Sequence, residues 1–81
     1  MASILIVDDE RSIRNSLKEI LEHEDFIIET AESGHQALEI LKQKQADLVL
    51  CDIKMPQMDG IELLEILQKE YSSTPVVMIS G

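Results

Sequence analysis

The sequence predicts an α/β fold, a doubly wound parallel sheet with helices on both faces. Four short apolar runs are almost continuous and rich in β-branched residues, which is typical of strands that are buried on both sides. Three segments with helical periodicity alternate with these runs. The resulting order is β-α-β-α-β-α-β. Because crossovers between parallel strands are right-handed, the helices are expected to cover both faces of the sheet.

The elements follow in order along the chain. The predicted strands comprise residues 4–7, 26–28, 48–51 and 76–79. The helical stripes consist of Ile13, Leu17, Ile20 and Leu21, then Ala37, Leu38, Ile40 and Leu41, and finally Leu63, Leu64, Leu67 and Tyr71. Positions three and four residues apart share one side of a helix, so each stripe is expected to face the sheet.

Helix starts are marked by capping residues. Ser33 lies three residues before Gln36, and Asp59 lies three residues before Glu62, so both pairs have the form of a capping box. Asp9 is expected to cap the first helix.

Composition and charge exclude several classes of protein. Sixteen acidic residues against seven basic ones give a net charge of −9, which argues against direct binding to nucleic acid or an anionic membrane. The single cysteine excludes an intramolecular disulfide and favours a reducing, cytoplasmic location. No apolar run approaches the roughly 18–20 residues of a membrane span, and no basic stretch precedes the first apolar run. We therefore expect neither a membrane anchor nor a signal peptide.

Polar side chains follow three of the predicted strands. Asp8 and Asp9 follow the first strand, Asp52 the third and Ser80 the fourth. Ligand sites of open α/β sheets lie beyond the carboxyl ends of the strands. If the first and third strands are neighbours, three carboxylates meet there. Because such oxygen ligands repel one another, they favour a hard cation such as Mg²⁺.

Each of these residues also has a simpler interpretation. An aspartate after a strand is commonly a turn residue or a helix cap, and a serine at a strand end is commonly a turn former. Three acids that converge on one edge are much harder to explain as caps alone. Nucleotide binding is not indicated, because the chain contains neither G-x-G-x-x-G nor G-x-x-x-x-G-K-[ST].

Three stretches together resemble the CheY-like receiver domain of two-component response regulators. They comprise residues 4–10, 52–60 and 76–80, and the second reads D-I-K-M-P-Q-M-D-G. The likeness covers essentially the whole chain in order. It implies a flavodoxin-like receiver fold with strand order 2-1-3-4. The stretches at 52–56 and 77–81 are similar to receivers attached to nitrogen-regulation-type transcriptional activators.

The resemblance implies a role for each of five residues. Asp52 matches the phosphoacceptor, which takes a phosphoryl group from a histidine kinase or phosphotransfer protein. Asp9 and Asp52 match carboxylates that bind Mg²⁺ directly, with the backbone carbonyl of Lys54 as a third ligand, and Asp8 matches the acid that holds the ion through water. Ser80 matches the hydroxyl residue that moves toward the phosphoryl group as the switch.

These roles imply a signalling phosphoacceptor, not an enzyme, whose phosphorylation switches an output. One alternative stays open: a receiver-like protein-interaction module that works without phosphorylation. A phosphatase of the haloacid-dehalogenase type fits less well, because such proteins place a D-x-D pair after the first strand, and here Asp8 and Asp9 are adjacent.

Compared with the receiver pattern, residues 1–81 stop before the fourth helix, the fifth strand and the fifth helix. We therefore expect a partial receiver domain. The pattern's fifth strand carries a lysine that pairs with the phosphoryl group, so phosphorylation of these residues alone is expected to be weak. The fourth strand is expected to be an exposed edge, which favours a homodimer or a swapped oligomer.

Two further residues have expected structural roles. Gly60 is expected to let the backbone turn tightly into the third helix. Cys51, inside an apolar strand, is expected to be an inert buried thiol.

Overall fold

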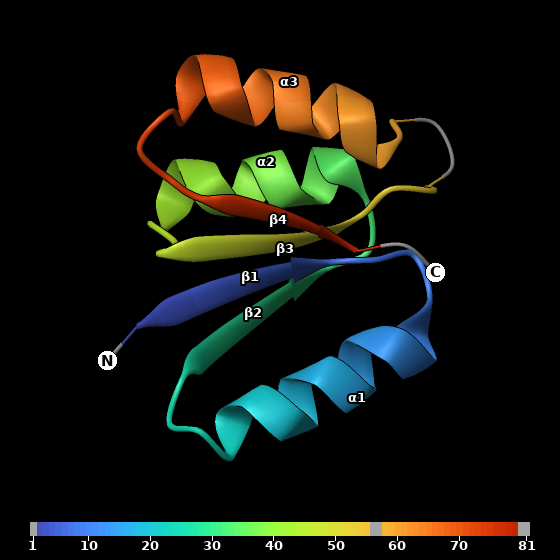
Figure 1. Cartoon of the computed structure of the whole chain (residues 1–81), viewed down its shortest axis with the longest axis vertical. Coiled ribbons are helices and arrows are strands. Elements are labelled where there is room, and N and C mark those ends of the chain that lie inside the picture. Colours follow the sequence, from blue (N-terminus) through green and yellow to red (C-terminus); the bar gives the residue numbers. More distant parts are fainter. Residues whose placement is uncertain (1, 56–57, 80–81) are drawn as a thin grey trace.

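A computed structural model of the chain describes residues 2–55 and 58–79. Its elements alternate along the chain as predicted: β1 (Ser3–Val7), α1 (Arg11–Glu22), β2 (Ile27–Ala31), α2 (Gly34–Gln43), β3 (Leu48–Asp52), α3 (Gly60–Glu70) and β4 (Val76–Ile79). Figure 1 shows α1 on one side of the sheet and α2 and α3 on the other. The predicted doubly wound α/β arrangement is therefore confirmed.

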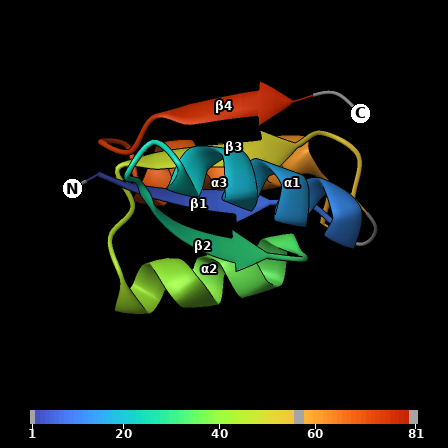
Figure 2. The same cartoon turned by 90° about the horizontal axis from the view of Figure 1, so that it is seen from below.

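The four strands form one parallel sheet in the order β2-β1-β3-β4. Figure 2 shows the four arrows pointing in the same direction. The predicted strand order 2-1-3-4 is confirmed. β2 departs most from its predicted range of 26–28: it begins at Ile27 and continues to Ala31, because Glu29 and Thr30 also pair with β1. β1 and β3 are each one residue longer than predicted.

Alternate side chains of β1 build two separate cores. Leu5 and Val7 belong to the core beneath α2 and α3, whereas Ile4 and Ile6 belong to the core beneath α1, and all four are at most 4% exposed. Successive side chains of a strand point to opposite faces, so a strand covered on both sides needs an unbroken apolar run. The continuous pattern in the sequence reflects this double burial.

The buried face of the first helix is narrower than the predicted apolar stripe. Leu17 and Leu21 pack against the sheet, but Ile20 is 62% exposed, so its predicted place on the buried face is wrong. α1 packs mainly against β1 and β2, which lie next to each other at the β2 edge of the sheet. A helix that covers two strands has no apolar partner for a residue at the margin of its stripe.

The helix caps agree with the sequence at two of three sites. The Ser33 hydroxyl accepts a hydrogen bond from the Gln36 amide at 3.1 Å, and the Asp59 carboxylate accepts one from the Glu62 amide at 2.9 Å. The predicted cap at Asp9 is wrong. Glu10 occupies the cap position of α1 and makes no side-chain cap bond.

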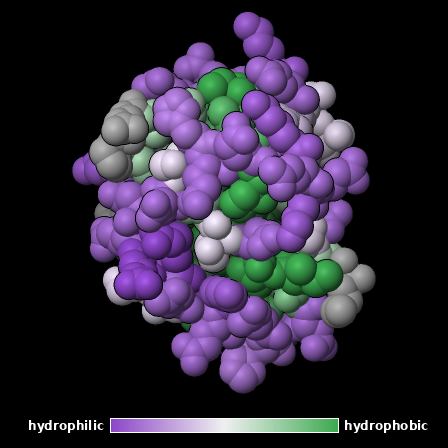
Figure 3. Space-filling model, turned by 180° about the vertical axis from the view of Figure 1, so that it is seen from behind, coloured by the Kyte–Doolittle hydropathy of each residue, from purple (hydrophilic) through white to green (hydrophobic). Residues whose placement is uncertain are grey.

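The β4 strand lies at one edge of the described sheet, as expected. Val77 is 46% exposed on this strand. Seen from behind, the surface is mostly hydrophilic, with separate hydrophobic areas between the polar side chains (Figure 3). Within the described ranges, every helix is too short or too polar to traverse a bilayer.

The end of α1 is closed by a Schellman turn, in which crossed backbone bonds satisfy the last carbonyls of a helix. The Phe26 amide donates to the Leu21 carbonyl at 3.4 Å, and the Asp25 amide donates to the Glu22 carbonyl at 3.1 Å. The turn requires a left-handed residue, and Asp25 adopts a φ of 65°. Phe26 and Leu21 then pack in the same apolar cluster.

Replacing Asp25 by glycine is predicted to stabilise the fold by about 0.5–1 kcal/mol, because glycine adopts positive φ without the steric cost that other residues bear. Urea unfolding measures the change. The matched control is Glu24→Gly, since Asp25 is the only non-glycine residue with positive φ among the described residues. The control should lose stability. A gain at Glu24, or a loss at Asp25, would contradict this account of the turn.

Candidate functional site

The pairing of β1 with β3 brings three carboxylates together. Val7 lies opposite Cys51 in the parallel register, so the residues that follow them, Asp8 and Asp52, come next at the same edge of the sheet. Carboxylate oxygens of Asp8, Asp9 and Asp52 all lie within 4.8 Å of one another. The convergence expected from the sequence is thus present in the structure.

The three carboxylates differ in their access to water. Asp8 is 2% exposed and Asp52 is 6% exposed, whereas Asp9 is exposed. The cluster therefore has two buried members and one at the surface. Buried charges are unfavourable unless they are paired, hydrogen-bonded or bound to a metal ion.

Asp8 is fixed from three directions. Its carboxylate accepts a hydrogen bond from the Glu10 amide at 2.9 Å, and its own amide donates to the Ala31 carbonyl at 3.1 Å. The guanidinium of Arg14 donates to the Asp8 carbonyl at 2.7 Å. Sequence reasoning missed Arg14, because it lies beside the apolar stripe of the first helix. The signal that could have found it is a basic residue in the first turn after an acidic strand end.

Burial raises the pKa of the Asp8 carboxyl above its ordinary value, and the negative charges of Asp52 and Asp9 raise it further. The Glu10 amide bond and the charge of Arg14 act in the opposite direction. The folded chain therefore holds a proton on Asp8 more tightly than the unfolded chain does. Ionised Asp8 at neutral pH costs stability, and a bound cation would recover it.

The chain after Asp52 is held by backbone hydrogen bonds. The Ile53 amide donates to the Ile79 carbonyl at 3.1 Å, and the Gly60 amide donates to the Ile53 carbonyl at 2.8 Å. The Lys54 amide donates to the Asp52 carboxylate at 3.4 Å. Among the described residues, no donor bonds to the Lys54 carbonyl.

Gly60 has a different role from the one expected. No glycine in the described part of the chain has positive φ, so a tight turn is not the reason for glycine here. A Cβ at this position would overlap the Asp52 carbonyl oxygen and would lie 2.7 Å from Cα of Ile53. Gly60 is thus required because the start of α3 lies directly against the backbone of Asp52. This close approach is a tertiary contact that the sequence alone does not reveal.

Cys51 lies next to Asp52 in β3 and is fully buried and free. Burial, together with the negative charges of Asp52 and Asp8, raises the pKa of its thiol to about 12. The thiol is therefore protonated at neutral pH. Its predicted character as an inert buried cysteine agrees with this environment.

Ser80, the predicted switch hydroxyl, lies outside the described residues. Its neighbour Ile79 pairs with Asp52 in the sheet.

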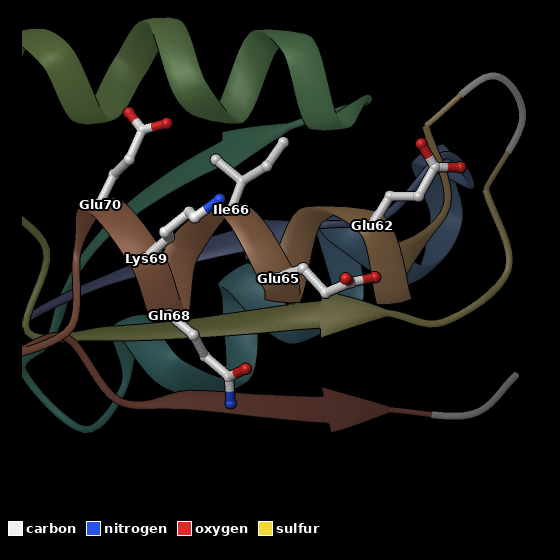
Figure 4. A pocket seen from close by; sticks show the side chains of 6 residues that line it. All are labelled: Glu62, Glu65, Ile66, Gln68, Lys69 and Glu70. Carbon is white, nitrogen blue, oxygen red and sulfur yellow. The ribbon is translucent and has the colours of Figure 1, made fainter.

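Two hollows on the surface differ in their relation to the carboxylates. One of about 500 Å³ is lined by residues that include Asp9, Lys54 and Asp59, so it opens beside the cluster. A larger one of about 720 Å³ lies along α3, where Figure 4 shows all its side chains projecting from that single helix. The larger hollow contains none of the three clustered aspartates. The smaller one is therefore the candidate space for a reacting group.

Comparison with known proteins identifies the family. The sequence profile of the response regulator receiver domain matches residues 4–81. The chain is 42% identical to a putative NtrX-like response regulator of Rickettsia bellii, and 42% identical to the transcriptional regulatory protein CpxR of Escherichia coli. It covers 100% of its own length in both comparisons, but only 17% of the first relative and 34% of the second.

Solved receiver structures superpose closely on the chain. A CheY-like receiver from Methanospirillum hungatei gives a TM-score of 0.96 at 38% identity, over 100% of this chain and 65% of that one. The response regulator TrrA of Thermotoga maritima, solved in complex with Mg²⁺-BeF, gives 0.94 at 39% identity, over 99% of this chain and 70% of that one.

Fold and acidic site together define a CheY-like signalling domain. The chain belongs to the response regulator receiver domain family of two-component systems. The predicted similarity to nitrogen-regulation-type regulators agrees with the NtrX-like relative, and CpxR matches at the same identity. The chain spans about a third or less of the length of these two relatives.

Replacing Asp8 by asparagine is predicted to stabilise the metal-free protein at neutral pH. The substitution removes a buried charge and keeps an oxygen that can accept from the Glu10 amide. At low pH the Asp8 carboxyl of the wild type is protonated in both the folded and the unfolded protein. The gain in stability should therefore vanish as the pH falls below the ordinary carboxyl pKa. Urea unfolding in the presence of a chelator, at neutral and acidic pH, measures this difference.

The control for this substitution is Glu65→Gln, which removes the same charge from an exposed position of α3 and should change stability by less than about 0.5 kcal/mol. Added Mg²⁺ should stabilise the wild type more than the Asp8→Asn variant. A variant that is less stable than wild type in chelator would show that ionised Asp8 carries no net cost.

Proposed function

We propose that this chain is the phosphoacceptor module of a two-component response regulator and that Asp52 receives the phosphoryl group. The observation that carries the proposal is the convergence of Asp8, Asp9 and Asp52 within 4.8 Å, at the carboxyl edge of a receiver-family sheet. This edge is where open α/β sheets bind their ligands.

Asp52 is more suitable than Asp8 as the nucleophile. The Asp8 carboxylate accepts from the Glu10 amide, and its raised pKa disfavours the charged form. Asp52 receives only a long hydrogen bond of 3.4 Å from the Lys54 amide, at Oδ1. Among the described residues no donor is bonded to its Oδ2, so a lone pair is available for attack on phosphorus.

We propose that Asp9, Asp52 and the Lys54 carbonyl hold Mg²⁺, with Asp8 as the buried acid behind them. Their chemistry fits, because oxygen ligands with closely spaced negative charge suit a hard divalent cation. TrrA, a relative at 39% identity, was solved with Mg²⁺-BeF. When bound, the ion would neutralise charge on the carboxylate and on the phosphoryl oxygens.

The proposed reaction is a phosphoryl transfer from nitrogen to oxygen. A carboxylate oxygen of Asp52 attacks the phosphorus of a phosphohistidine on a histidine kinase or phosphotransfer protein. The P–O bond forms as the P–N bond breaks, and the electron pair returns to the imidazole nitrogen, which takes up a proton. The product on this chain is an acyl phosphate, whose added charge is the signal that an output can read.

The family supports our proposals for the output and the location. We expect phosphorylation to switch a regulatory output, such as the transcription controlled by relatives of this class, with Ser80 as the switch hydroxyl. We expect the protein to work in the cytoplasm, as its single free cysteine and its similarity to response regulators indicate.

The Asp52→Asn substitution is predicted to abolish phosphorylation. Wild-type protein incubated with Mg²⁺ and acetyl phosphate should gain the mass of one phosphoryl group in part of the molecules, as measured by intact-mass spectrometry. Asp52→Asn should gain none, because an amide oxygen is a far weaker nucleophile than a carboxylate. Chelation of Mg²⁺ should also suppress the wild-type gain.

The control is Asp25→Asn, an exposed aspartate at the end of α1, which should be phosphorylated as the wild type is. Equal labelling of wild type and Asp52→Asn would place the acceptor elsewhere. No labelling of wild type, combined with specific binding to a histidine kinase, would favour the alternative of a module that works without phosphorylation.

A second copy of the chain is the partner that we propose for the β4 edge. β4 is the last strand of the described sheet, and Val77, 46% exposed, lies beside Leu50 in the register. Parallel-sheet edges present unpaired backbone groups that can pair with another strand. The net charge of −9 opposes such pairing, so association should be sensitive to salt.

Self-association is predicted to rise with ionic strength and to fall by about tenfold or more on Val77→Lys, because a charged residue blunts a sheet edge. Sedimentation velocity over a concentration series at low and high salt measures both effects. The added lysine also lowers the net negative charge, which by itself should favour association. Weaker association of this variant would therefore show that the β4 edge forms the contact. Glu65→Lys, with the same charge on α3, is the control. A protein that stays monomeric at high concentration and high salt would exclude this partner.

A further inference from the structure

The start of α2 contains a space that a side chain of another loop fills. Gly34 is buried at the first position of α2. A Cβ built there would lie 2.6 Å from Sδ, 3.1 Å from Cγ and 3.3 Å from Cβ of Met58. Three successive atoms of Met58 therefore lie along Gly34. The absence of a side chain at position 34 provides a seat for Met58, which is itself packed against the larger core.

Met58 is connected to the candidate site through its immediate neighbours. Asp59, the next residue, caps α3 by accepting from the Glu62 amide at 2.9 Å. Gly60 follows, and its amide donates to the Ile53 carbonyl at 2.8 Å, while its Cα faces the backbone of Asp52 without space for a Cβ. A displacement of Met58 would therefore move Gly60, two residues later, which packs directly against the backbone of Asp52.

Helix formation does not explain glycine at position 34. Among the described residues no glycine has positive φ, so an alanine could adopt this backbone conformation. Alanine also favours helices more than glycine does, and the Ser33 cap on the Gln36 amide does not need a glycine after it. Local structure alone would predict that Gly34→Ala is stabilising. The contact with Met58 opposes this gain, because a Cβ at position 34 would force the Met58 side chain to move.

We propose that Gly34 is a positioning residue for the phosphoacceptor site and acts by seating Met58. This inference rests on the proposed function of Asp52. By leaving room for Met58, this residue of α2 keeps the start of α3 in place, and with it the backbone of Asp52 and Ile53. A side chain at position 34 should loosen the site without touching any of its ligands.

Three variants test the proposal: Gly34→Ala, Met58→Ala and the double variant, with His35→Ala, the adjacent exposed residue of α2, as control. Amide chemical shifts of the metal-free protein report on the backbone at Asp52, Ile53 and Lys54. Calorimetric titration with Mg²⁺ reports on the assembled site. Gly34→Ala should shift the signals of those amides and weaken Mg²⁺ binding by about tenfold or more, which is the usual effect of substituting residues that support metal ligands.

The double variant should return the amides toward their wild-type positions and restore Mg²⁺ affinity to within about threefold. This rescue distinguishes a positioning role from a general loss of stability. If Gly34→Ala acted only by destabilising the fold, the additional truncation of Met58 would weaken Mg²⁺ binding further. Wild-type affinity in folded Gly34→Ala, or no recovery in the double variant, would overturn the proposal. If Gly34→Ala fails to fold, a folded double variant supports the seat, and an unfolded one refutes it.

Failure of the proposed function would look different. If wild-type protein binds no Mg²⁺ and accepts no phosphoryl group at Asp52, the function is wrong. The amide shifts of the metal-free variants still decide whether Gly34 positions the Asp52 backbone.

Discussion

The parallel pairing of β1 with β3 is the constraint on which both the core and the site depend. Its register places Val7 opposite Cys51, so the strands end together and deliver Asp8 and Asp52 to the same edge. A slip of one residue would turn every side chain of a strand to the other face of the sheet. Because both faces are buried against helices, such a slip would cost the two cores as well as the site.

The site is stabilised by the fold more than by its own interactions. Two carboxylates are almost completely buried a few ångströms apart, which raises the pKa of Asp8. Backbone groups of β2 and of the segment before α1, together with Arg14, hold Asp8 in place against this repulsion. The two apolar cores supply the stability that offsets it. An arrangement that is unfavourable until a cation binds is common where function, not stability, decides the sequence.

Features that depend on local pattern could be predicted from the sequence, and features that depend on contacts between distant elements could not. The continuous apolar runs indicated strands buried on both sides, and the strand ends indicated the acidic cluster. Ile20 was placed on the buried face because periodicity does not tell how many strands a helix covers. The reason for Gly60 and the contact of Arg14 with Asp8 were missed, because each depends on a neighbour that only the tertiary fold supplies.

The buried state of Cys51 has a consequence for the choice of nucleophile. β3 offers two candidates side by side, a thiol at Cys51 and a carboxylate at Asp52, and an ionised thiol is intrinsically the stronger nucleophile. With the pKa of Cys51 raised to about 12, almost no thiolate exists at neutral pH, and successive side chains point to opposite faces of the strand. The sheet thus removes sulfur from competition with Asp52, the proposed acceptor, and burial protects this neighbouring cysteine from oxidation.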